Sequence, residues 1–169
     1  MTVTTRSGTV ERDGEVYALR FERDYQASIG EVWSAMTDPE RTPRWLGELH
    51  GHPAMGETMH LVMGESDDER ARLDIVECRE PHRVEVGWAF PGAPRTRLVV
   101  DLSEVAPDRT HLRLWHTGWT AQEIPGYGCG WHHYVDALAA YLAGEKLPVF
   151  EDYYPALLDE WKGRTAAAS

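Results

Sequence analysis

The sequence predicts an α+β fold in which a curved antiparallel sheet of about six to seven strands wraps around one long C-terminal helix. Three observations lead to this fold. From His50 to Thr117, apolar residues recur at every second position in several short runs, which is the period of half-buried strands. No helical pattern alternates with these runs, which disfavours a doubly wound parallel sheet. From about Pro125 to Ala143, the period changes to that of an amphipathic helix.

Length and charge limit the class of protein. The chain has 169 residues, so we expect a single domain over 1–169, with its core at about 16–144. There are 17 Lys and Arg residues against 28 Asp and Glu, a formal net charge of −11. This balance argues against nucleic acid or an anionic membrane surface as a partner. No apolar run approaches the roughly 20 residues that span a bilayer, and no N-terminal leader pattern is visible. The two cysteines are expected to be reduced thiols, so we expect a cytoplasmic protein.

The N-terminal region predicts a strand followed by two short helices. Residues 1–14 are polar and without a sustained period, so we expect a loose arm that could pair late onto the sheet. Residues 16–25 alternate between apolar and polar and predict a strand. Ser28 and Glu31 form a capping-box pattern that begins a helix. Asp38-Pro39 ends that helix and starts a second short one.

The middle of the chain predicts the rest of the sheet. Turn signals such as Gly92-Ala93-Pro94 and Pro107-Asp108-Arg109 separate the alternating runs. The runs lie within 56–64, 70–78, 83–90, 95–105 and 110–117. We expect the acidic segment 67–69 to be a solvated hairpin tip.

The C-terminal region predicts the helix that the sheet wraps. It covers about 125–143, with Gly144 in place as a left-handed cap. A last short helix is expected over 153–161 and a frayed tail over 163–169. A curved sheet around a single helix leaves a wedge-shaped gap, and gaps of this kind hold ligands.

Three segments resemble a known family. The segment IGEVWSAMTDPE at 29–40, followed by Arg44-Trp45-Leu46, resembles the opening of the SRPBCC family. Within this START-like, Bet v 1-like superfamily, the likeness is to the group related to the C-terminal domain of the Hsp90 ATPase activator Aha1. The segments LWHTGW at 114–119 and GWHHYVDALAAYL at 130–142 resemble that group's last strand and final helix. The likeness runs from about 16 to 144.

The resemblance implies a helix-grip fold with an internal cavity, and three functional hypotheses. Members bind small apolar molecules, lipids or polyketides, so we favour binding of a small hydrophobic or aromatic ligand. Some members are cyclases or aromatases, which leaves a polyketide cyclase or dehydratase as the alternative. Others protect antibiotic producers, and Aha1 itself binds Hsp90. We rank Hsp90 last among the partners, because the chain lacks the additional N-terminal domain that Aha1 uses.

His116 is the strongest polar candidate for the cavity. It falls in the inward register with Leu112 and Leu114, where it could orient a ligand carbonyl or act as a catalytic acid or base. The alternative is a core histidine satisfied by a neighbouring group. Trp88 also has the register to face the gap, and Trp131 is expected to cap one end of it.

The start of the long helix supplies the other candidates. His132 lies beside the apolar face and four residues before Asp136, so the two could form a solvated pair or help to hold a ligand. Tyr134 and Val135 complete the expected ligand-binding set. By helix geometry, His133 points away, and we assign it no role.

Other chemistry finds little support. No Cys cluster or HExxH motif is present, and we expect neither a metal nor another cofactor. The glycines of 126–130 do not follow the GxGxxG spacing and are expected to let the chain bend into the helix. Cys129, with His132 or His133 as its base, is disfavoured as a nucleophile in so acidic a chain. Trp115 should face outward, where a homodimer contact stays open.

Overall fold

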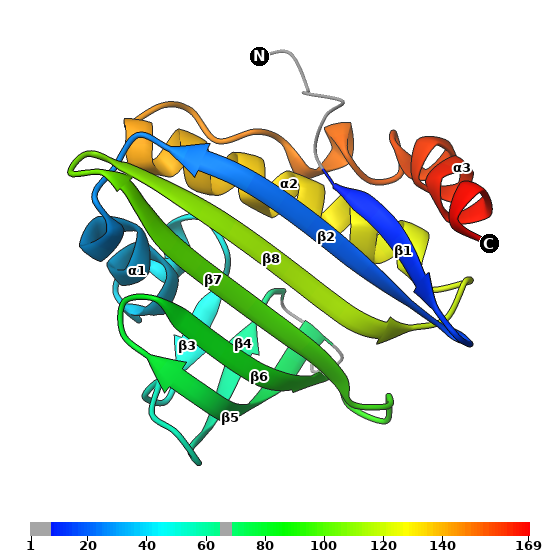
Figure 1. Ribbon diagram of the computed structural model, residues 1–169, viewed down its shortest axis with the longest axis horizontal. Helices are drawn as coiled ribbons and strands as arrows, with labels where there is room; N and C mark the ends of the chain where they lie inside the picture. The colour runs from blue at the N-terminus through cyan, green and yellow to red at the C-terminus, as the bar shows by residue number, and fades with distance from the viewer. Residues whose placement is uncertain (1–7, 65–68) are drawn as a thin grey trace.

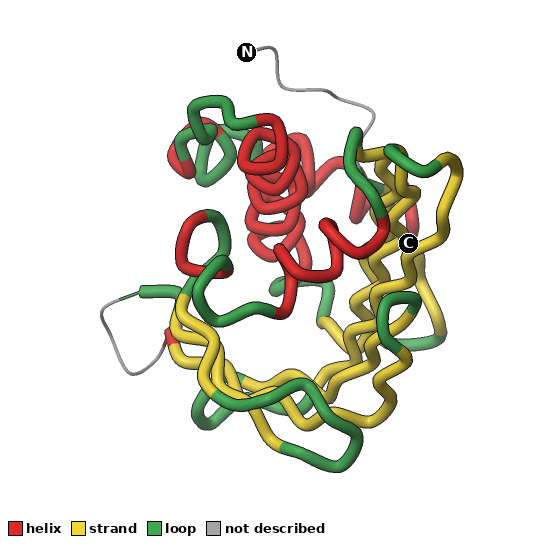
Figure 2. Tube along the Cα trace, turned by 90° about the vertical axis from the view of Figure 1, so that its left-hand side faces the viewer, coloured by secondary structure: helices red, strands yellow, loops and turns green. Residues whose placement is uncertain are grey.

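The computed structural model describes residues 8–64 and 69–169, and within them eight strands form one antiparallel sheet. The sheet curls so that its concave face is turned toward the helices (Figures 1 and 2). In order across the sheet, the strands are β1 (Thr9–Asp13), β2 (Val16–Tyr25), β8 (Arg109–Trp119), β7 (Thr96–Ala106), β6 (Arg83–Ala89), β5 (Arg70–Arg79), β4 (Thr58–Val62) and β3 (Glu48–His50). The predicted fold class is confirmed, with slightly more strands than expected.

The long central strands place the apolar residues on one face. In the register of β2, β8 and β7, Leu19 lies opposite His116, and His116 lies opposite Leu98. All three side chains are buried on the concave face. His116 therefore occupies the middle of the sheet, as the alternation in β8 predicts.

A serine cap begins the first helix, and a glycine ends the long one. The hydroxyl of Ser28 accepts a hydrogen bond from the amide of Glu31 and caps α1 (Ile29–Thr37). The carboxylate of Glu31 forms an ion pair with Arg41, 2.5 Å away, rather than completing the capping box. A 3-10 turn at Thr42–Arg44 is the second short helix. The helix gripped by the sheet is α2 (Ile124–Ala143), and Gly144 ends it with a φ of 69°.

One expectation for the chain ends is confirmed in part, and the other is wrong. The N-terminal arm contains β1, which pairs with β2 at the edge of the sheet, as the expected late pairing allowed. The expected frayed tail belongs to α3 (Leu158–Ala168), which begins later than the predicted last helix and follows a 3-10 turn at Phe150–Asp152. The physical reason is Trp161, which is fully buried, with its ring centroid 5.6 Å from that of Phe21.

Two further predictions concern particular segments. Most of the acidic hairpin tip expected at 67–69 lies outside the described residues. The glycines of 126–130 lie inside the first turns of α2, not in a bend before it. At Gly128, a Cβ atom would lie 2.4 Å from the ring of Trp161, so the absence of a side chain there is what admits the anchor of α3. None of the described helices is long and apolar enough to cross a membrane.

Candidate functional site

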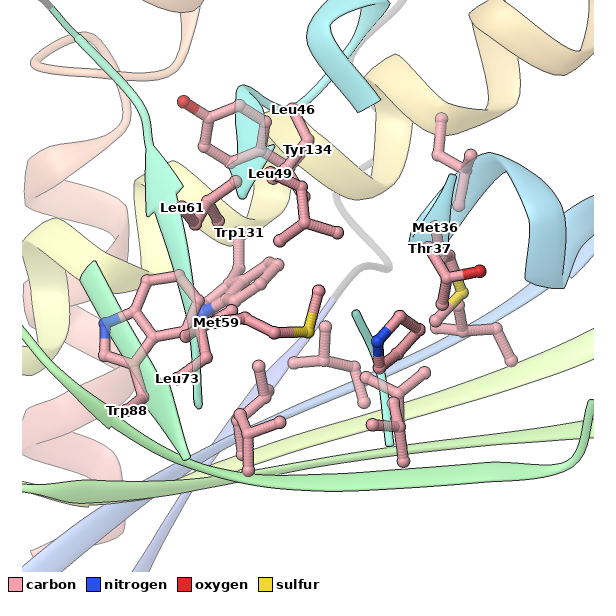
Figure 3. Close-up of a pocket in the computed structure, with 18 of the residues that line it drawn as sticks. Met36, Thr37, Leu46, Leu49, Met59, Leu61, Leu73, Trp88, Trp131 and Tyr134 are labelled. Carbon is pink, nitrogen blue, oxygen red and sulfur yellow. The ribbon is translucent and has the colours of Figure 1, made fainter. Parts of the chain in front are cut away.

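An apolar cavity of about 110 Å³ lies between α2 and the sheet. Figure 3 shows Met59 near its middle, with Trp88 and Trp131 on one side and Met36 and Thr37 on the other. Among the described residues, no charged side chain lines this inner cavity. The space can therefore hold a small apolar group, and it offers little to a polar one.

A second, larger cavity of about 680 Å³ adjoins the start of α2. We call it the outer cavity. Trp88, Trp131 and Tyr134 line both cavities, so these three rings form the boundary between them. The other residues that line the outer cavity are Met63, Glu69, Phe90, Glu123, Gly126, Tyr127, Gly130, His133, Phe150 and Tyr154.

His116 lies beneath this boundary and lines neither cavity. Its Nδ1 accepts a hydrogen bond from the indole Nε1 of Trp131 over 3.0 Å. Its Nε2 lies 2.8 Å from the hydroxyl of Thr96, and that hydroxyl donates to the carbonyl of Trp88. Nε2 therefore carries the proton and donates to Thr96, which makes the ring a neutral imidazole.

The environment of His116 keeps it uncharged. Its side chain is fully buried and in contact with the rings of Trp88, Trp119 and Trp131. Burial lowers the pKa of His116 to about 3, because the cation would lose its hydration without gaining a counter-ion. The geometry matches a core histidine satisfied by its neighbours, and its effect is to hold Trp131 in place at the boundary.

His132 lies away from both cavities. Its ring packs against Phe21, Tyr153 and Trp161 and is fully buried. Nε2 of His132 is 4.0 Å from Oδ2 of Asp136, whose side chain is 8% exposed. The expectation of a solvated pair is therefore wrong, because the C-terminal segment covers this side of α2.

Asp136 is the centre of a buried polar cluster. The hydroxyl of Tyr153 donates to its Oδ2 over 2.6 Å, and the guanidinium of Arg23 lies 2.6 Å from its Oδ1. A buried carboxylate needs such partners to offset its desolvation. The cluster ties the C-terminal segment and β2 to α2, and it makes no contribution to the walls of either cavity.

His133 belongs to the lining of the outer cavity, so the expectation that it points away is wrong. Its Nε2 lies 3.1 Å from the carbonyl of Pro148, and its ring meets Phe150 edge to face. Burial lowers the pKa of His133, so its ring is neutral near pH 7. The segment after Gly144 is folded back over this part of α2, which helix periodicity does not reveal.

The structure brings four of the six predicted ligand-binding residues to the cavities. Trp88, Trp131, Tyr134 and Val135 line the inner cavity, whereas His116 and His132 line neither. Sequence reasoning missed the aromatic residues of the outer wall, which are Phe90, Tyr127, Phe150 and Tyr154. Phe90 follows the inward alternation of β6, so its register was a usable signal. Phe150 and Tyr154 lie in a segment without periodicity.

The remaining residues considered from the sequence, Cys129 and Trp115, lie away from the cavities. Cys129 is fully buried, and burial raises its pKa to about 11, which leaves the unreactive thiol at neutral pH. Trp115 faces the opposite side of the sheet, with the guanidinium of Arg97 5.1 Å from its ring. No group of three or more metal-ligating side chains occurs among the described residues.

Comparisons with known proteins agree with this architecture. The nuclear magnetic resonance structure of CalU16 from Micromonospora echinospora has 26% sequence identity and a TM-score of 0.76, covering 99% of this chain and 100% of that one. DynU16, described as a putative protein in the dynemicin biosynthetic locus, has 24% identity and a TM-score of 0.68, covering 79% of this chain and 50% of that one. An Hsp90 activator from Plasmodium falciparum, at 18% identity and a TM-score of 0.53, covers 62% of this chain and 74% of that one. The last two share the fold alone.

The family assignment comes from the sequence itself. A search of the curated proteins found no match. The family model described as activator of Hsp90 ATPase homolog 1-like protein matches residues 26–143, from just before α1 to the end of α2. This match confirms the resemblance seen in the opening, last-strand and final-helix segments. The chain belongs to the activator of Hsp90 ATPase homolog 1-like family, with the SRPBCC-type helix-grip fold.

Proposed function

We propose that this protein binds a small hydrophobic or aromatic molecule in the two adjoining cavities between α2 and the sheet. The observation that carries the proposal is the shared boundary of Trp88, Trp131 and Tyr134, with an uncharged cavity on one side and an aromatic one on the other. A ligand seated against these rings exchanges contact with water for contact with apolar and aromatic surface.

The sizes of the cavities define what such a ligand looks like. Pockets for drug-sized molecules measure roughly 300–1,000 Å³, and the outer cavity of about 680 Å³ falls within this range. The inner cavity of about 110 Å³ accepts a small apolar group at most. If a ligand buries roughly 300 Å² of apolar surface, the gain is about 7 kcal/mol before the costs of association.

The surroundings of the candidate catalytic groups favour binding over turnover. Both ring nitrogens of His116 are engaged with Trp131 and Thr96, so neither is available to a substrate. Cys129 is buried as a thiol away from both cavities. The cyclase or dehydratase alternative therefore lacks the acid or base that the sequence offered for it.

A neutral hydrophobic dye, N-phenyl-1-naphthylamine, tests the proposal. Gly130 lines the outer cavity, and a Cβ atom there meets nothing within 4 Å, so Gly130→Leu places a side chain inside the cavity without a clash at Cβ. Gly163→Leu is the matched control, because Gly163 lies in α3 and an added Cβ is equally unobstructed. We expect enhanced dye fluorescence with the wild type and the control, and about tenfold weaker binding with Gly130→Leu. Absence of dye binding by the wild type, or equal binding by both variants, would contradict the proposal.

A further inference from the structure

The outer cavity combines aromatic walls with carboxylates. Phe90 and Tyr127, which both line the cavity, stack at 6.1 Å between centroids, and Tyr127 is backed by the buried ring of Trp119 at 3.7 Å. Trp131 meets Tyr134 edge to face, at 6.3 Å. The exposed side chains of Glu69 and Glu123 also belong to the lining of this cavity. Aromatic faces and carboxylates share one electrostatic property, since both attract positive charge.

The described lining offers nothing that would attract an anion. It contains no Lys or Arg residue. His133 is the remaining basic group, and burial lowers its pKa, so it adds no charge near pH 7. Burial, and then the nearby carboxylate of Glu123, raises the pKa of Tyr127, while Glu69 acts in the same way on Tyr134. Each carboxylate is thus close enough to be felt by a tyrosine of the wall.

The two cavities differ in the charge of the residues that line them. No charged residue of the described chain lines the inner cavity, whereas two acidic residues line the outer one. An amphipathic ligand would therefore place its apolar part toward the boundary rings and its charged part toward the acidic residues. The formal net charge of −11 adds a long-range attraction for cationic ligands.

We infer that the outer cavity selects ligands in which a protonated amine is attached to an aromatic or apolar body. The amine faces the carboxylates that line this cavity, those of Glu69 and Glu123, and the body packs against Trp88, Trp131 and Tyr127. This inference rests on the proposed function and adds the class of ligand. Two further rings of the lining, those of Phe150 and Tyr154, come from the segment after residues 26–143, which the family model does not cover.

Three naphthalene probes of matched size test the charge preference. They are 1-naphthylmethylamine, which is a cation at neutral pH, 1-naphthylmethanol, which is neutral, and 1-naphthaleneacetate, whose carboxylate is an anion at neutral pH. Binding is measured by titration calorimetry with the full-length protein. We expect the amine to bind about tenfold more tightly than the alcohol and the carboxylate to bind more weakly than both. The advantage of the amine should shrink from low to high salt, because the carboxylates are exposed.

A charge-neutral variant locates the effect. In the double variant E69Q/E123Q, the amine should lose its advantage while the alcohol keeps its affinity. The control is E15Q/E104Q, which changes the net charge by the same amount at exposed positions outside both cavities and should keep the advantage. Circular dichroism checks that both variants are folded.

The outcomes separate the inference from the proposed function. If none of the probes binds the wild-type protein, the proposed function fails. If the alcohol binds as tightly as the amine, or if E69Q/E123Q preserves the preference, the binding function stands and the cationic selectivity is overturned. If both double variants lose the preference equally, the effect comes from net charge, and the assignment to Glu69 and Glu123 is wrong.

Discussion

Replacing His116 by glutamine should make the stability of the protein less sensitive to acid. In the native state, the ring is fully buried, and burial lowers its pKa to about 3 from an ordinary value of 6.5. The native state therefore resists protonation, whereas the unfolded chain takes up a proton as the pH falls below that ordinary value. Proton uptake by the unfolded chain favours unfolding, so the stability is present above that pH and is lost as the pH falls toward 3.

The size of the effect follows from these two pKa values. Relative to alkaline pH, the linkage costs about 0.2 kcal/mol at about pH 7 and about 2.7 kcal/mol at about pH 4.5. His116 alone therefore removes about 2.5 kcal/mol of the free energy of unfolding over this interval. The His116→Gln variant should start less stable, by about 1–3 kcal/mol, because the indole of Trp131 and the hydroxyl of Thr96 lose a well-placed partner. Its stability should then decline less steeply with acid.

Urea unfolding followed by tryptophan fluorescence, at several pH values between about 7 and 4.5, measures this difference. Carboxylates and the other histidines titrate in both proteins, so subtracting the two curves isolates His116. A wild-type advantage that falls by about 2.5 kcal/mol toward acid, and changes sign if it starts below that value, supports a neutral, buried imidazole. Parallel curves would show that His116 takes up its proton in the native state, and the reasoning from burial would then be refuted.

Two substitutions test how the C-terminal segment is attached. Gly128→Ala should lower the melting temperature, because its Cβ would meet the ring of Trp161 at 2.4 Å. In the control Gly130→Ala, the Cβ meets nothing within 4 Å, and the variant should gain up to about 1 kcal/mol of stability from helix propensity. Equal shifts in melting temperature would mean that the packing of Trp161 does not depend on the missing side chain at Gly128. Tyr153→Phe removes the hydroxyl that donates to Asp136 and should cost about 1.5–3 kcal/mol in urea unfolding, and an unchanged unfolding midpoint would show that this contact does not hold the segment.

Much of the inner cavity could be predicted from periodicity. Trp88 faces inward because β6 alternates, and Trp131, Tyr134 and Val135 follow from the helical spacing in α2. The inward register of His116 was predictable for the same reason. Its partners were not, because Thr96 lies on the neighbouring strand and Trp131 lies on the helix, and only packing brings them to one imidazole.

The outer cavity and the His132 environment could not be predicted in this way. Phe150 and Tyr154 lie in a segment with no regular pattern, so nothing local indicates that they return to α2. The i to i+4 spacing of His132 and Asp136 is the same for an exposed pair and a buried one. Coverage by Tyr153 and Trp161 decides between the two.

The sequence by itself determined the strand and helix pattern, the Ser28 cap of α1, the glycine that ends α2, and the register of the inner-cavity residues, because each depends on neighbours a few positions apart. The family was also evident from the sequence segments themselves. Only the tertiary structure decided that His116 is sealed by Trp131 and Thr96, that His132 is buried, and that a C-terminal segment completes an aromatic cavity with an acidic rim. These outcomes depend on which distant surfaces exclude water from one another, and residue spacing along the chain carries no record of that.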